Sequence, residues 1–158
     1  MLVQRELGLR PSELLALETT DVSLPEHQHA PRTLRAVVAL GVSVGTKSKR
    51  AQAALLKDAL LINLLRYVIS MTKPGDRIFP FSYTTYRRLL INVEQKLSVS
   101  IGWTPHSPRA GFASVSIQDG ASFWETREAG RWLADSSLRV YIDLVAVGQI
   151  SSSQGCCR

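Results

Sequence analysis

The spacing of apolar residues along the chain predicts several helices. In the middle of the sequence, Leu60, Leu61, Leu64, Leu65 and Val68 recur every three to four residues, which is the period of one helical face. This helix begins near Asp58 and ends at the breaker Lys73-Pro74-Gly75. Similar patterns and breaks predict a helix that begins at about Pro11 and further helices over Ser82–Leu97, His106–Gln118, Ser122–Ala129 and Asp135–Leu144.

A different pattern separates the first two helices. Leu34–Val44 is rich in Val, Leu and Ala, which favours a strand, and Ala51–Leu56 can return as a second strand. The basic segment Gly45–Arg50 between them then forms the turn of a β-hairpin, with Lys47 near its bend. Asp21–Arg32 contains two prolines and several polar residues and is expected to be a loop. The predicted fold is therefore mainly α with a small antiparallel β-sheet.

Composition narrows the class of protein. The chain has 158 residues, of which 45% are hydrophobic, so one packed domain is expected. It has no apolar run of about 18 residues, and Leu2–Leu9 carries Arg5 and Glu6, so neither a membrane span nor a secretory signal is expected. The only cysteines, Cys156 and Cys157, are adjacent in a Ser-rich tail, which favours an intracellular protein without disulfides. The net charge of +6 suits a polyanionic partner such as nucleic acid.

A scattered set of polar residues suggests the chemistry. A metal-free attack on a phosphodiester needs two arginines to hold the phosphate oxygens, a tyrosine nucleophile, and a lysine and a histidine to move protons. Arg10, Lys47, His106, Arg109 and Tyr141 supply one such set, and His106 and Arg109 share a helical face at a spacing of three. Taken singly, each residue also fits an ordinary role on the surface or in the core. Their combination points to one reaction class that needs neither a metal nor a cofactor.

The order of these residues resembles the catalytic domain of the tyrosine recombinases, the phage integrase family. The similarity covers about Leu7 to Asp143. Gly-Leu-Arg-Pro-Ser-Glu around Arg10 resembles the first arginine motif, and Thr46-Lys47-Ser48 resembles the hairpin lysine. His106-Ser107-Pro108-Arg109 resembles the family's His-x-x-Arg, and Trp132 precedes Tyr141 by the family's nine residues.

The resemblance implies roles for these residues. Tyr141 attacks the scissile phosphate and forms a 3′-phosphotyrosine, Arg10 and Arg109 clamp the non-bridging oxygens, and Lys47 protonates the leaving 5′-oxygen. His106 accepts the tyrosine proton or holds the phosphate, and Trp132 donates its indole N–H to a phosphate oxygen. Glu13 can orient Arg10, and Arg131 takes the phosphate contact in place of Trp132 if the motif slips by one residue.

The same resemblance sets expectations for domains and partners. Residues 1–148 are expected to form the catalytic domain without its opening helix and without the N-terminal DNA-clamping domain, and residues 149–158 a disordered tail. The expected partner is double-stranded DNA, with self-association on it, and the expected reaction is DNA recombination or integration. A topoisomerase-like reaction shares this chemistry. Two non-catalytic alternatives stay open: a DNA-binding remnant of the same fold, and a basic helical interaction domain.

Overall fold

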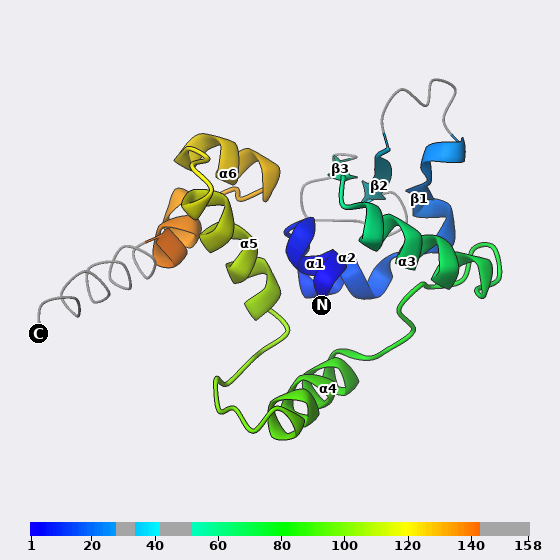
Figure 1. Cartoon of the computed structure of the whole chain (residues 1–158). Coiled ribbons are helices and arrows are strands. Elements are labelled where there is room, and N and C mark those ends of the chain that lie inside the picture. The colour runs from blue at the N-terminus through cyan, green and yellow to red at the C-terminus, as the bar shows by residue number, and fades with distance from the viewer. Residues whose placement is uncertain (28–33, 42–51, 143–158) are drawn as a thin grey trace, which may run out of the picture.

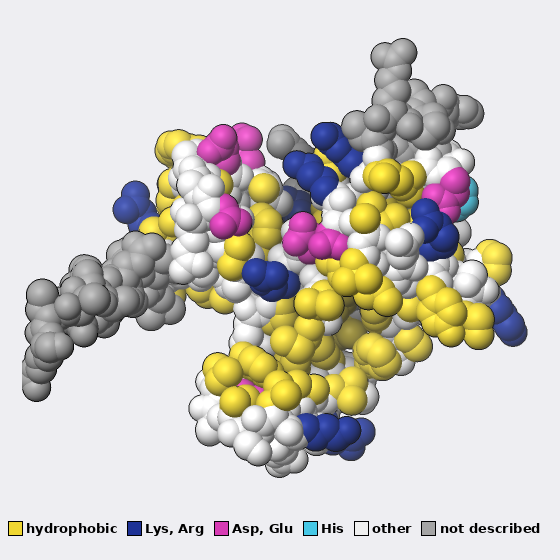
Figure 2. Space-filling view, viewed as in Figure 1, with side chains coloured by type: hydrophobic (Ala, Val, Ile, Leu, Met, Phe, Trp, Pro, Cys, Tyr) yellow, Lys and Arg dark blue, Asp and Glu magenta, His cyan; other side chains and the backbone are white. Residues whose placement is uncertain are grey.

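The computed structural model describes residues 1–27, 34–41 and 52–142, and these residues form a mainly helical protein with one small sheet. Figure 1 shows three parts. On the right of the view, the sheet lies with α1 (Leu2–Glu6), α2 (Pro11–Ala16) and α3 (Ala59–Ser70); on the left lie α5 (Ser107–Gln118) and α6 (Phe123–Ala129); and α4 (Tyr83–Lys96) lies below them. The space-filling view in Figure 2 shows α4 as a separate lobe. The mixture of helices with a small antiparallel sheet confirms the fold class that the sequence predicts.

Two short helices open the chain. The first, α1 (Leu2–Glu6), was not predicted, and α2 (Pro11–Ala16) begins at the predicted proline. The turn between them places Gly8 at φ +57°, and a Cβ built there would lie 2.9 Å from a ring carbon of Phe112. Glycine therefore suits this position both by its backbone conformation and by the close approach of α5.

The sheet has three antiparallel strands in the order β1-β2-β3, one more than the sequence predicted. Strand β2 (Ala36–Leu40) pairs with β3 (Gln52–Leu56), so that Val38 lies opposite Ala54, and this pairing confirms the predicted hairpin strands. The bend that carries Lys47 lies outside the described residues. The prediction of a loop over Asp21–Arg32 was wrong in part, because its residues include β1 (Val22–Ser23), which pairs with β2. A strand of two residues is too short for an alternating pattern to reveal it.

Short 3₁₀ turns flank that strand. The first, η1 (Thr19–Asp21), follows α2, and the second, η2 (Pro25–His27), follows β1. The chain leaves the sheet through α3 (Ala59–Ser70), where the Asp58 carboxylate caps the helix by accepting a hydrogen bond of 2.9 Å from the Leu61 N–H. This confirms the predicted start of the helix at Asp58.

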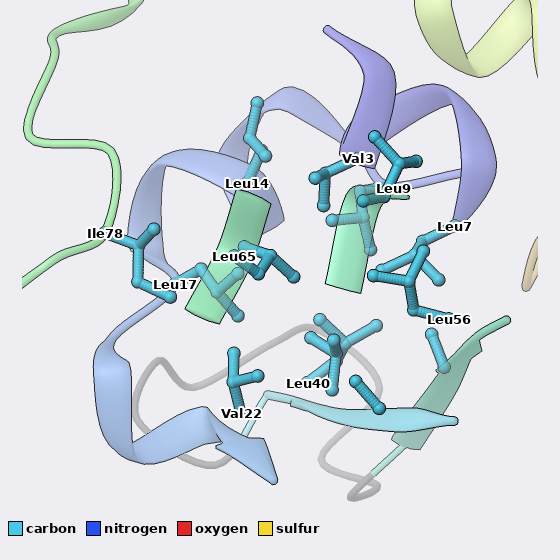
Figure 3. Packing of buried hydrophobic residues seen from close by; sticks show 14 of the residues in the cluster. Val3, Leu7, Leu9, Leu14, Leu17, Val22, Leu40, Leu56, Leu65 and Ile78 are labelled. Atoms are coloured by element: carbon cyan, nitrogen blue, oxygen red, sulfur yellow. The ribbon is translucent and has the colours of Figure 1, made fainter. Parts of the chain in front are cut away.

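The main hydrophobic core lies between the sheet and α1, α2 and α3. Strand residues alternate, so that Ala36, Val38 and Leu40 face inward from β2. Figure 3 shows aliphatic side chains from the first two helices and their turn meeting those of the sheet and α3. The largest of these side chains are fully buried: Leu9, Leu17, Leu56, Ile62 and Leu65. Aliphatic burial on this scale is the main force that stabilises this half of the molecule.

Helix α4 (Tyr83–Lys96) is joined to the rest by few buried side chains. Only Tyr86 and Leu90 of this helix are buried, and Arg87, Arg88 and Lys96 lie on its exposed side as predicted. The Tyr86 hydroxyl donates to the Gln4 side-chain oxygen at 2.5 Å, and Gln4 Nε2 donates in turn to the Pro105 carbonyl at 2.8 Å. Gln4 is fully buried, so this network connects α1, α4 and the start of α5 inside the protein.

The last part of the described chain carries three helical segments. They are α5 (Ser107–Gln118), α6 (Phe123–Ala129) and residues 135–142, close to the predicted bounds. A second, smaller hydrophobic cluster lies among them, built on Ala113, Trp132 and Leu138. Among the described residues, no helix is long and apolar enough to cross a membrane.

Candidate active site

The site is built first on the start of α2, where Arg10 precedes the helix. Arg10 Nη1 and the Glu13 carboxylate form a salt bridge of 2.6 Å, and the same carboxylate accepts the Arg10 backbone N–H at 2.8 Å. Arg10 Nη2 also donates to the Arg131 carbonyl at 2.9 Å. The side chain of Arg10 keeps 37% of its surface exposed, so solvent still reaches this arginine although its guanidinium is fixed from two sides.

Arg109 is the most buried charged group of the site. It lies in the first turn of α5 and is only 5% exposed. Its guanidinium donates to the backbone carbonyls of Gly8 and Gly130, the latter at 2.6 Å, and lies 4.1 Å from the centre of the Trp132 ring. Burial, followed by the like charge of Arg10, lowers the pKa of Arg109 to about 10. The arginine is still charged at neutral pH, and aromatic and carbonyl groups surround it in place of water.

Trp132 connects Arg109 to Tyr141. Its ring is stacked on Phe112 with 6.2 Å between centroids and meets Tyr141 edge-on at the same separation. A Cβ built on Gly130 would lie 1.6 Å from a ring carbon of Trp132, so only glycine fits beneath this ring. Tyr141 is half-buried in the same cluster, in the helical segment 135–142. The ring of the proposed nucleophile is therefore held by aromatic packing.

Arg131 holds this segment to the first half of the chain. Its backbone adopts φ +58°, an uncommon conformation for a residue with a side chain. Arg131 Nη2 lies 3.3 Å from the carbonyl oxygens of Leu7 and Gly8 and from Glu13 Oε2, and only 7% of its side chain is exposed. Burial lowers the pKa of Arg131, and the Glu13 carboxylate acts against that shift.

Glu13 is the acidic centre shared by two of these arginines. Burial tends to raise the pKa of its carboxyl group, but the backbone hydrogen bond from Arg10 and the charges of Arg131 and Arg10 outweigh burial and hold the pKa below its ordinary value. Glu13 is thus an anion between the two guanidinium groups. With Arg109 beside them, the site keeps an excess of positive charge, which suits a phosphate group.

Of the two residues predicted to move protons, His106 and Lys47, only His106 lies among the described residues. His106 is the N-cap residue of α5, directly before the turn that carries Arg109, and its side chain is exposed and makes no capping hydrogen bond. Lys47 lies outside the described residues. The structure brings Arg10, Glu13, Arg109, Trp132 and Tyr141 together with Arg131, while the catalytic roles of all these residues stay predictions.

Sequence reasoning missed the partners that hold the arginines. The carbonyl oxygens of Gly8 and Gly130 and the ring of Phe112 had not been singled out. A carbonyl group is present in every residue, so no sequence signal marks it as an arginine acceptor. Among the described residues, no group of three or more His, Cys, Asp or Glu side chains could hold a metal ion.

The fold of this chain is similar to that of several solved structures. The XerA recombinase superposes with a TM-score of 0.70 over 99% of the chain, at 19% identity, and the match spans 55% of XerA. The chain has a tyrosine recombinase-like fold. The XerH site-specific recombinase, in a post-cleavage complex with its palindromic difH substrate, matches 96% of this chain and 43% of its own with a TM-score of 0.69 and 15% identity.

A third match extends this likeness to a transposon protein. The Tn1549 transposon integrase, in complex with a circular intermediate DNA, matches 89% of this chain and 52% of its own with a TM-score of 0.66 and 15% identity. No protein-family model matches the sequence, and no curated protein matches it. Judged by the shares of the solved chains that are matched, this chain spans about half the length of the recombinases whose fold it has.

Proposed function

We propose that this protein cleaves and rejoins DNA strands through a tyrosine–phosphate intermediate, as the catalytic part of a recombinase or integrase. The observation that carries the proposal is the meeting of four residues from distant segments. Arg10 contacts the segment of Trp132 through the Arg131 carbonyl, Arg109 lies on the Trp132 ring, and that ring meets Tyr141. A chance set of motif matches gives no reason for these residues to share one cluster within a recombinase-like fold.

The proposed reaction uses residues of the chain alone. The Tyr141 hydroxyl attacks the phosphorus, the bond between phosphorus and the 5′-oxygen breaks, and a 3′-phosphotyrosine remains. His106 accepts the tyrosine proton, and Lys47 gives a proton to the leaving 5′-oxygen. Attack on the phosphotyrosine by that 5′-hydroxyl, or by one from another strand, forms a phosphodiester and releases Tyr141, which regains its proton from His106. The phosphodiester bond energy is conserved in the intermediate, so rejoining needs no external energy source.

The arginines take different parts in this proposal. Arg10 is the more exposed and can meet a phosphate oxygen while Glu13 holds its other side. Arg109 contributes its charge from behind Trp132 and reaches the phosphate directly only if its guanidinium leaves the carbonyl of Gly8 or Gly130. Charges fixed before the substrate arrives stabilise the negative transition state without the cost of reorganising solvent.

The proposed partner is double-stranded DNA. Figure 2 shows Lys and Arg side chains gathered beside the sheet, on the side toward α6, and the chain as a whole carries a net charge of +6. The XerH and Tn1549 proteins were both solved in complex with DNA. We extend the proposal to an intracellular protein whose copies associate on DNA, with residues 1–148 as the catalytic domain.

The burial of the site supports a second candidate function. Arg109 is 5% exposed and Trp132 is 7% exposed, so both are better placed for packing than for touching a phosphate. A protein that keeps the fold but only binds DNA is compatible with this arrangement. The two candidates differ in one product, the covalent bond between protein and DNA.

The decisive experiment is trapping on a nicked DNA substrate that releases a short 5′-hydroxyl strand and so prevents rejoining. The unaltered protein should form a covalent adduct that survives denaturation. Tyr141→Phe should abolish the adduct while non-covalent DNA binding persists, because the ring that packs on Trp132 is kept. Tyr67→Phe is the matched control, since Tyr67 is 66% exposed and lies on α3, away from the site.

Each other outcome has a definite meaning. An undiminished adduct in the Tyr141→Phe protein refutes the assignment of the nucleophile. DNA binding without any adduct in the unaltered protein, on substrates of several sequences, supports the binding-only function. Absence of both DNA binding and adduct refutes both candidates and leaves only the fold.

A further inference from the structure

Helix α1 carries a polar side chain, Gln4, that is fully buried and takes no part in the proposed reaction. Its amide nitrogen Nε2 donates to two carbonyl groups, that of Leu9 at 3.2 Å and that of Pro105 at 2.8 Å. Both N–H groups of the amide are thereby used, and Oε1 accepts the Tyr86 hydroxyl at 2.5 Å. Every polar atom of this side chain therefore has a partner inside the protein.

The two carbonyl groups belong to the peptide units that lead into two residues of the candidate site. The Leu9 carbonyl is part of the peptide bond to Arg10, and the Pro105 carbonyl is part of the peptide bond to His106. Figure 1 shows α1 between α2, which follows Arg10, and α5, which follows His106. A peptide unit is planar, so holding its oxygen restricts the direction in which the next residue leaves it. One buried amide thus joins the backbone of two segments that are far apart in the sequence.

The Tyr86 hydroxyl determines which way the Gln4 amide faces. Burial raises the pKa of Tyr86 to about 12, so the phenol keeps its proton at neutral pH and donates it to Gln4 Oε1. The carbonyl groups of Leu9 and Pro105 can only accept, so they require the NH2 end of the amide. A donor on one side and two acceptors on the other leave a single orientation. The amide is therefore fixed before any substrate arrives.

We propose that Gln4 is a positioning residue for DNA cleavage, which acts by holding the peptide units before Arg10 and His106 and does not touch the DNA. This inference rests on the proposed function, in which Arg10 holds a phosphate oxygen and His106 takes the tyrosine proton. Both side chains must then reach the same phosphate, so the relative position of their backbones matters. A displacement of about 1 Å between groups that act together can lower a rate about a hundredfold.

Gln4→Met tests the proposal, since methionine has about the same length and removes all three hydrogen bonds. The rate constant of adduct formation is measured with saturating nicked DNA, at a temperature where every variant is folded. It should fall about 10- to 100-fold, with the affinity for DNA unchanged. Tyr86→Phe keeps both bonds to the carbonyl groups, so its rate should fall far less. Leu65→Ala is the matched control, because Leu65 is buried on α3 in the main core, and it should lower the stability but not the rate.

The double variant Gln4→Met/Tyr86→Phe separates positioning from stability. Gln4→Met alone leaves the Tyr86 hydroxyl buried without a partner, which lowers the free energy of unfolding. Removing that hydroxyl as well should restore part of the stability, as thermal unfolding measures, while the rate stays low because both bonds to the carbonyl groups are still missing. The double variant also takes the place of Gln4→Met if that protein does not fold. Recovery of the rate together with the stability would overturn the proposal.

Amide hydrogen exchange, without DNA, tests the positioning apart from the reaction. The N–H groups of Arg10 and Ala110, at the starts of α2 and α5, should exchange faster in both Gln4 variants but not in the core control, relative to the Thr126 N–H of α6. Faster exchange without an adduct in the unaltered protein would refute the proposed reaction and confirm that Gln4 holds the two segments. An undiminished rate of adduct formation in Gln4→Met, with unchanged exchange, would overturn the role of Gln4 and leave the proposed reaction intact.

Discussion

The two hydrophobic clusters of this protein are built in different ways. The larger cluster, between the sheet and α1 to α3, consists almost wholly of aliphatic side chains such as Leu9, Leu56 and Leu65. The smaller cluster, among α5, α6 and residues 135–142, is built around Trp132, with Phe112, Phe123 and Tyr141 packed against it. The charged Arg109 lies against the ring of Trp132.

The difference shows how the candidate site is supported. The larger cluster is held together by the burial of aliphatic side chains. The smaller one is joined to it by polar contacts, since Arg109 and Arg131 donate to the carbonyl of Gly8 and Arg10 donates to that of Arg131. The arginines assigned to chemistry therefore also connect the two halves. Changes at these positions should therefore alter the stability of the protein as well as the proposed activity.

Trp132→Ala should have the largest effect. Removing this buried ring takes away the centre of the smaller cluster and uncovers Arg109, so we expect a loss of about 3–5 kcal/mol in the free energy of unfolding. Trp124→Ala is the control, because Trp124 is 61% exposed on α6, and its loss should stay below about 1 kcal/mol. Denaturant unfolding followed by circular dichroism measures both. Equal losses would mean that the smaller cluster is not held by Trp132.

Substituting two glycines by alanine should change the free energy of unfolding in opposite directions. Gly130→Ala puts a methyl group 1.6 Å from a ring carbon of Trp132, so the ring must move, at a cost of about 2–3 kcal/mol. Gly111→Ala lies inside α5, where the nearest atom is 3.9 Å away, and should stabilise the protein by about 0.5–1 kcal/mol through helix propensity. Thermal unfolding of the two variants checks both signs. A tolerated Gly130→Ala would contradict the described position of the Trp132 ring.

At Arg131, the effects of the side-chain contacts and of the backbone conformation on stability can be measured separately. Arg131→Ala removes the contacts with Leu7, Gly8 and Glu13 but keeps a side chain at φ +58°, whereas Arg131→Gly removes the same contacts and relieves the backbone. The glycine variant should therefore be more stable than the alanine variant by about 1 kcal/mol. Equilibrium unfolding of both proteins measures this difference. An alanine variant as stable as the glycine variant would argue against the left-handed backbone at Arg131.

The smallest expected effect is the acid sensitivity contributed by Glu13. Its pKa is lower in the folded protein than in the unfolded chain, so its stabilisation is fully present above the unfolded pKa and is lost as the pH falls through the folded one. Glu13→Gln should therefore flatten the fall of stability at acid pH, as measured by unfolding over a pH series. Glu125→Gln is the comparison, because hydrogen bonds with Ser122 also lower the pKa of Glu125, but this carboxylate lies at an exposed cap of α6. Its replacement should change the acid dependence of stability less than Glu13→Gln does. An unchanged acid slope in the Glu13→Gln protein would show that the arginines do not hold this carboxylate.

Much of the fold was predictable because the relevant signals are local. The Asp58 cap, the apolar period of α3, Pro11 at the start of α2 and Ser122 at the start of α6 each act within a few residues. The strand β1 was missed because it exists through its pairing with β2 and has only two residues. The helix α1 was missed because five residues carry too little periodicity to identify it.

The sequence by itself determined which residue types are available for phosphate chemistry and their order, since motifs at Arg10, His106, Arg109, Trp132 and Tyr141 can be recognised without coordinates. Only the tertiary structure decided how these side chains contact one another and the backbone around them. It turned Arg109 toward two backbone carbonyls and Trp132, and made Arg131 a link between distant segments. The physical reason is that these contacts use carbonyl groups and ring faces. Every residue has a carbonyl, and a ring face can pack in many directions, so neither leaves a distinctive trace in the sequence.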